Sequence, residues 1–337
     1  SKQASKQASS SYESLVNSES KQRIEWVDYA KAICMFFVIM SHTKAPLEYT
    51  SFCRPFFLTC FFVLSGFFLL NPQKEFCLRK KSISIFSSLF LPYILWWFVT
   101  TAVENILVGN YNFGGDFVCS LLYGRKIWFI SVLICAELLV SLALTFVPKQ
   151  CYIALPFAFL NIYLLLPQIQ IWYFDVSFFA SFYLCIGVLL RLHWDSFSLL
   201  IDNMVVGWSV VLISVLLYVS DLLFIHNVGA FHSSFSSLAF FLFQSITSVF
   251  ALLFLCKQLP SGLSVMLFVG RNTLLYLLFQ HQALVLIQHF RERVWGLERS
   301  YVMSAIIPFV VLLLLVVPIM LTNRYIPILS GKYRPIK

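Results

Sequence analysis

Long apolar segments alternate with short polar segments along almost the whole chain. A helix needs about 20 mostly apolar residues, and at least about 17, to cross the hydrocarbon core of a bilayer. Segments of this kind recur along the chain and predict an all-α fold, a polytopic membrane bundle of about ten transmembrane helices. The predicted spans are 26–43, 54–70, 83–103, 127–147, 151–167, 176–191, 204–223, 235–256, 264–289 and 302–321.

The composition supports the same class of protein. The chain is 60% hydrophobic and 12% charged, with a mean hydropathy of +0.83, whereas about 25% of the residues in an ordinary soluble domain are charged. We divide the chain into a polar tail at 1–22, a membrane domain at 23–325 and a basic cytoplasmic tail at 326–337. The first tail is rich in serine and too polar to form a core, so we expect disorder and not a signal peptide.

The net charge of +9 follows the predicted topology and does not indicate a nucleic-acid partner. An even number of spans places both termini on one side, and the positive-inside rule assigns that side to the cytoplasm. In this topology the predicted outer side holds a minority of the basic residues, namely Lys44, Arg54, Arg125, Lys126, Arg291, Arg293 and Arg299. The expected location is an inner (plasma) membrane, with lipids as neighbours.

The nine cysteines show no C-x-x-C pair and no metal-ligand spacing, so we expect no metal site. Most of them lie in apolar segments, where cysteine behaves as a small hydrophobic residue. Cys53 and Cys119 fall near the predicted outer face. A disulfide between them is one alternative, and two free thiols are the favoured one.

Three ionisable residues of the first span, Asp28, Lys31 and His42, share one helical face. A helix turns about 100° per residue, so Lys31 and His42 differ in direction by about 20° and Asp28 lies about 60° from Lys31. Lys31 and His42 are about 16 Å apart along the axis. Ionisable groups are rare in hydrocarbon and indicate function there. The predicted topology puts the charged pair near the cytoplasmic entrance and His42 towards the exterior.

The first two spans resemble the acyltransferase-3 family of membrane O-acyltransferases. The family signature is a basic residue, usually Arg, then ten residues, then His, and here it stands as Lys31 and His42 in DYAKAICMFFVIMSH. PFFLTCFFVLSGFFL (Pro55–Leu69) resembles the second family helix, and VGRNTLLYLLFQHQ resembles a late family element. Two departures are the Lys at position 31 and a displacement of His281 by a residue or two from the family histidine.

The resemblance implies transfer of an acetyl or short acyl group from cytoplasmic acetyl-CoA to a hydroxyl of a bacterial surface glycan or its lipid-linked precursor. Acetyl-CoA is then a co-substrate, and no permanently bound cofactor is expected. His42 is the expected general base or transient acyl carrier, since imidazole titrates near neutral pH. Lys31, with Asp28, is expected to orient the donor or to hold the helix in register. A simple Lys31–Asp28 ion pair is an equal alternative.

Further residues are candidates for substrate binding, and all but Arg271 have a structural alternative. They are Arg79, Lys80, Trp128, Arg271, Asn272 and His281. The alternatives are topology signals for the basic pair, an interfacial anchor for Trp128, a helix cap for Asn272 and a polar helix contact for His281. Glu137, in the middle of the fourth span, needs an unidentified partner.

A transporter or flippase for a glycan or small metabolite is the alternative function, because ionisable groups inside a helix bundle suit transport as well. Transporters usually contain internal repeats with broken helices at matched positions. The two halves of this chain show no such repeat, which favours the acyltransferase. A polysaccharide polymerase is disfavoured because the longest predicted outer loop, 105–126, is short for that activity.

Overall fold

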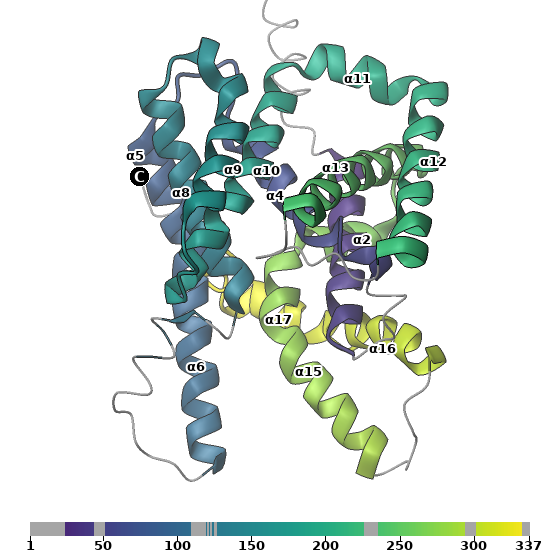
Figure 1. Cartoon of the computed structure of the whole chain (residues 1–337). Coiled ribbons are helices and arrows are strands. Elements are labelled where there is room, and N and C mark those ends of the chain that lie inside the picture. Colours follow the sequence, from purple (N-terminus) through teal and green to yellow (C-terminus); the bar gives the residue numbers. More distant parts are fainter. Residues whose placement is uncertain are drawn as a thin grey trace, which may run out of the picture.

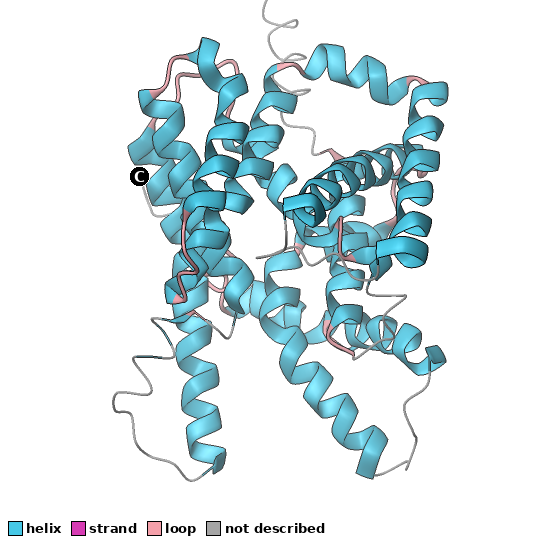
Figure 2. Ribbon diagram, in the orientation of Figure 1, coloured by secondary structure: helices cyan, strands magenta, loops and turns pink. Residues whose placement is uncertain are grey.

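The computed structural model describes residues 24–43, 51–108, 119, 121, 123–124, 127–225, 235–293 and 301–331. Within these ranges every regular element is a helix, as Figure 2 shows. The predicted tail at 1–22 lies outside the described residues, as do positions 332–337 of the C-terminal tail.

The described α-helices are between 8 and 24 residues long. In chain order they are α2 (Glu25–Ser41), α4 (Phe57–Leu69), α5 (Leu78–Ile85), α6 (Leu91–Val108), α8 (Trp128–Phe146), α9 (Leu155–Leu165), α10 (Phe174–Leu192), α11 (Trp194–Asp202), α12 (Met204–Ser220), α13 (Phe235–Gln258), α14 (Ser264–Arg271), α15 (Thr273–Arg293), α16 (Tyr301–Leu314) and α17 (Val316–Tyr325). A π-helical segment, Phe86–Phe90, joins α5 to α6 without a break.

Seven helical stretches in the described part of the chain are long and apolar enough to cross a membrane. They correspond to seven of the predicted spans, so the protein is an all-α polytopic membrane bundle. Two further predicted spans appear as shorter helices, namely α2 with 17 residues and the apolar stretch Lys149–Leu165.

The predicted span 264–289 is not one helix. The structure divides it into α14 and α15, and Asn272 stands at the break with φ −123° and ψ 21°. The side-chain Nδ2 of Asn272 donates to the carbonyl of Phe268, and its Oδ1 accepts from Nδ2 of Asn323, both at 2.8 Å. An asparagine side chain that bonds to the preceding turn and to α17 competes with a continuous helix at this point.

Helix α2 lies inside the bundle and contacts α4, α13, α14, α15 and α16 (Figure 1). Helix α4 packs closely on α10, because Gly66 of α4 faces the backbone of α10 and Gly187 of α10 faces the backbone of α4. A Cβ on Gly66 would lie 1.9 Å from the Leu184 oxygen, and one on Gly187 would lie 2.0 Å from the Val63 oxygen. Small residues allow this close approach of membrane helices. This packing holds α4, which also contacts α2, against α10.

Helix α11 was not anticipated from the apolar pattern. It joins α10 to α12 and crosses the top of the view in Figure 1, while α6 and α15 extend towards the opposite end. Cys53, which is buried, and Cys119, which is exposed, form no disulfide with each other, so the disulfide alternative is wrong.

Candidate active site

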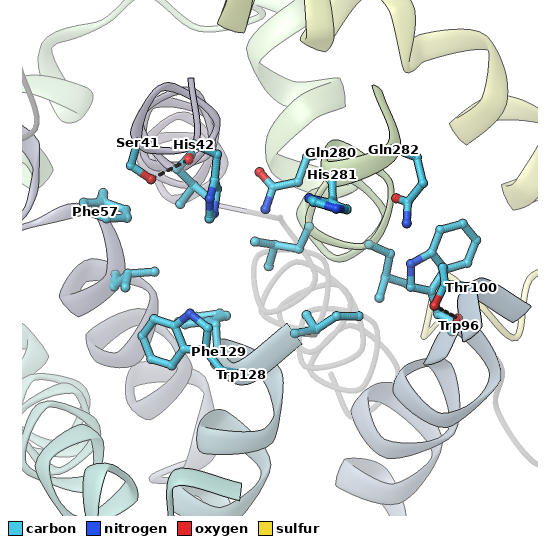
Figure 3. A pocket seen from close by; sticks show the side chains of 15 residues that line it. Ser41, His42, Phe57, Trp96, Thr100, Trp128, Phe129, Gln280, His281 and Gln282 are labelled. Carbon is cyan, nitrogen blue, oxygen red and sulfur yellow. Dashed lines mark hydrogen bonds between the residues drawn. The ribbon is translucent and has the colours of Figure 1, made fainter. Parts of the chain in front are cut away.

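His42 and His281 line one cavity of about 460 Å³, here called the histidine cavity. Figure 3 shows both imidazoles at this cavity, with Gln280 between them. His42 comes from the end of α2 and His281 from the middle of α15. Two histidines that are far apart in the sequence therefore line one cavity. His281 is one of them, although it is displaced by a residue or two from the family position.

Local hydrogen bonds hold His42 at the end of α2. The helix ends at Ser41, and the His42 backbone N–H still donates to the Ile39 carbonyl at 3.0 Å. The Ser41 and Thr43 hydroxyls donate to the carbonyls of Val38 and Met40, each at 2.7 Å. These bonds satisfy carbonyls that the helix end leaves without partners. The serine and threonine beside His42 thus fix the backbone that carries the imidazole.

Aromatic side chains supply much of the remaining wall of the histidine cavity. Trp128 and Phe129 come from the start of α8, Phe57 from the start of α4, and Trp96 from α6. The Trp96 ring packs on that of Phe279 with centroids 4.5 Å apart. Trp128, a sequence candidate for substrate binding, is therefore placed at the cavity.

A second cavity, of about 230 Å³, is lined by Lys31, Lys81, Glu137 and Thr273 among others and is here called the lysine cavity. The Lys81 ammonium lies 3.1 Å from Oε2 of Glu137. The Lys31 ammonium lies 5.5 Å from the centroid of the Phe68 ring, a cation–π distance. The cavity thus combines two cations with one carboxylate. It also supplies the partner that Glu137 requires.

The two cavities lie one above the other along the bundle. Each contributing helix supplies a residue to one cavity near one end and to the other cavity further along. The pairs, with the lysine cavity first, are Lys31 and His42 on α2, Phe68 and Phe57 on α4, Lys81 and Trp96 on the α5–α6 helix, Glu137 and Trp128 on α8, and Thr273 and His281 on α15. Phe129 and Leu277 line both cavities and form the partition between them.

Asp28 lies beside α14 and not in either cavity. Its carboxylate is 2% exposed and lies 3.4 Å from Nε of Arg271. A Cβ on Gly270 would lie 2.0 Å from the Asp28 carbonyl oxygen, so α14 touches the backbone of α2 here. Asp28 and Arg271 therefore join the start of α2 to the end of α14, close to Lys31.

The basic residues around position 80 divide into two groups. Arg79 and Lys80 are exposed on α5 and line neither cavity, whereas the next residue, Lys81, lines the lysine cavity. Asn272 also lines neither cavity. Arg79, Lys80 and Lys81 are three consecutive helical residues, so their side chains point about 100° apart. Only the packing of α5 on α8 distinguishes them.

One of three comparisons with known proteins gave a match. The family model described as an acyltransferase domain, that of the acyltransferase-3 family, matches residues 24–322. Comparisons with curated proteins and with solved structures gave no match. Since the matched range covers most of the chain and both cavities, the protein belongs to the acyltransferase-3 family and is a membrane acyltransferase.

Proposed function

We propose that the protein transfers an acetyl or short acyl group from cytoplasmic acetyl-CoA to a hydroxyl of a cell-surface glycan or its lipid-linked precursor, in a bacterial inner membrane with both termini cytoplasmic. The observation that carries this proposal is the pair of adjoining cavities, one with two lysines and the other with His42. The donor occupies the lysine cavity, and the acceptor occupies the histidine cavity.

The lysine cavity suits the phosphate-bearing end of CoA because its cations complement phosphate. Lys31 and Lys81 bring two ammonium groups, and Glu137 offsets one of them. Lys31 and His42 are about 16 Å apart along α2. An extended CoA molecule bridges such a distance with its pantetheine arm, which passes the partition at Phe129 and Leu277 and brings the thioester to His42.

His42 acts as the general base in this proposal. Its imidazole takes the proton from the acceptor hydroxyl, whose oxygen attacks the thioester carbonyl carbon. The C–S bond breaks as the C–O bond forms, and the CoA thiolate leaves and receives the proton from the imidazolium. The alternative is a relay, in which the imidazole first accepts the acyl group and then passes it to the hydroxyl.

The test uses membranes from cells that express the protein, since these carry the cells' own surface glycans and lipid-linked sugars. Acetyl-CoA labelled in the acetyl group is added, and label in the glycan fraction is measured. We expect His42→Ala to abolish transfer, whereas His289→Ala, an exposed histidine of α15 that lines neither cavity, retains it. Full transfer by a membrane-inserted His42→Ala protein contradicts the role of His42.

Two further measurements separate the alternatives. Label that stays on the protein in the absence of acceptor, and is lost in His42→Ala, indicates the relay. The transporter alternative predicts no transfer to any acceptor, combined with flux of a glycan or small metabolite into vesicles that contain the protein.

A further inference from the structure

The histidine cavity contains a buried carbonyl oxygen without a hydrogen-bond donor. Gln280 lines the cavity and is 8% exposed. Its Oε1 has no hydrogen-bond partner among the residues that the structure describes. Figure 3 shows this side chain between His42 and His281, with its oxygen on the side of His42. Buried polar atoms are rarely left without a partner, so this oxygen indicates a donor that comes from a bound molecule.

The nearby hydroxyl groups are already used within their own helices. Ser41 donates to Val38, and Thr100 donates to the carbonyls of Trp96 and Trp97 at 2.9 and 3.1 Å. The Gln282 amide, in the orientation that satisfies its contacts, donates to the carbonyls of Leu278 and Phe279. These groups are therefore not the donors for the Gln280 oxygen.

The wall of the cavity indicates the class of the missing donor. The fifteen described residues that line it include no Asp, Glu, Lys or Arg, so the cavity favours a neutral ligand. Trp96, Trp128 and Phe57 contribute aromatic surface, and Gln280 contributes an acceptor. A neutral ring with several hydroxyl groups, such as a sugar, offers both an apolar face for the aromatic rings and O–H donors for the amide oxygen.

We propose that Gln280 is a specificity-determining residue of the acceptor site, whose Oε1 accepts a hydrogen bond from a ring hydroxyl next to the one that His42 activates. The inference rests on the proposed function, because it assigns the acceptor to the histidine cavity. Gln280 selects and orients the sugar and does not take part in bond making. A vicinal diol, with one hydroxyl acylated and its neighbour recognised, is therefore the preferred acceptor.

The test measures transfer from labelled acetyl-CoA to methyl hexopyranosides of gluco, galacto and manno configuration by the protein in membranes. Gln280→Met keeps the side-chain volume and removes the oxygen. We expect the KM for the sugar to rise about tenfold or more, with the KM for acetyl-CoA unchanged. Gln288→Met, on the same helix but outside both cavities, is the matched control and keeps both KM values.

A second arm uses sugars that each lack one hydroxyl. In the wild-type protein one monodeoxy sugar should show the same rise in KM that Gln280→Met causes, and in Gln280→Met that deoxy sugar and its parent should have equal KM values. If the deoxy sugar has a KM that is raised by the same factor over its parent in the wild-type protein and in Gln280→Met, the assignment of Gln280 is wrong. Amounts of each variant in the membrane and the KM for acetyl-CoA show whether the variant is folded.

Two outcomes distinguish an error about Gln280 from an error about the proposed function. If His42→Ala abolishes transfer while Gln280→Met has the wild-type KM for every sugar, only the role of Gln280 is wrong. If the wild-type protein transfers label neither to the methyl hexopyranosides nor to the glycans of the membranes, the proposed function itself is wrong.

Discussion

The carboxylate of Asp28 and the guanidinium of Arg271 form an ion pair, with 3.4 Å between Oδ2 and Nε, although the residues are 243 positions apart in the chain. Asp28 is buried at 2% exposure, whereas the Arg271 side chain is 42% exposed. The pair fastens α14 to the start of α2, a few residues before Lys31. Asp28 and Arg271 therefore hold together the end of α14 and the part of α2 that precedes Lys31.

Replacing Asp28 with Asn tests this ion pair. The change keeps the shape of the side chain and removes its charge, and the half-exposed Arg271 stays hydrated, so the expected loss of stability is about 1 kcal/mol. This corresponds to a fall of about 2 °C in the unfolding temperature of the purified protein in detergent. Asp195→Asn, an exposed position on α11, is the control. Equal unfolding temperatures for the two variants would show that the pair contributes nothing.

Gly270→Ala should destabilise the same junction more strongly. The added Cβ would lie 2.0 Å from the Asp28 carbonyl oxygen and 2.6 Å from its carbonyl carbon, so α14 must move away from α2. We expect a fall in unfolding temperature larger than that of Asp28→Asn and a lower transfer rate. Val265→Ala, at a 67% exposed position of α14, should change neither quantity. Wild-type stability of Gly270→Ala would mean that the two backbones do not pack this closely.

Lys81 and Lys80 are neighbours with different predicted roles. Lys81→Met should raise the KM for acetyl-CoA about tenfold, because it removes the proposed hydrogen bond to a charged phosphate of the donor. Lys80→Met should leave that KM unchanged, since Lys80 is exposed outside both cavities. Steady-state kinetics with labelled acetyl-CoA give both values. The opposite ranking would favour Lys80 as the donor contact.

A companion variant separates donor binding from folding. Lys81→Met alone leaves the buried Glu137 carboxylate without its cation, which is destabilising in itself. Lys81→Met combined with Glu137→Gln removes both charges. We expect the double variant to recover the wild-type unfolding temperature and to keep the raised KM for acetyl-CoA. Recovery of the wild-type KM would show that Lys81 acts only through Glu137.

Leu277→Trp tests the passage between the cavities. Leu277 lines both cavities together with Phe129, so a larger side chain fills the space that the proposed route of the donor arm uses. We expect transfer to fall about tenfold or more, because a misplaced thioester no longer reaches His42. Leu286→Trp, a 48% exposed position of α15, should retain activity. Unchanged transfer by Leu277→Trp would exclude this route for the donor.

The sequence by itself determined the membrane fold class and the helical face that Lys31 and His42 share. Long apolar runs predicted helices because a bilayer accepts a polar backbone only when its hydrogen bonds are satisfied within the segment. Lys31 and His42 were placed on one face because the turn of a helix is a local property that does not depend on neighbours. The break at Asn272 was not predicted, because it depends on a side chain that contacts α17.

Only the tertiary structure decided which residues meet. Lys81 rather than Arg79 or Lys80 reaches the lysine cavity, Glu137 is its partner, and Gln280 stands beside His42. Apolar periodicity does not contain this information, because lipid and protein interior are similarly apolar and either can cover a given helix face. The choice depends on close packing between helices, such as that of Gly66 on α10 and Gly270 on α2, which sets the rotation and height of each helix.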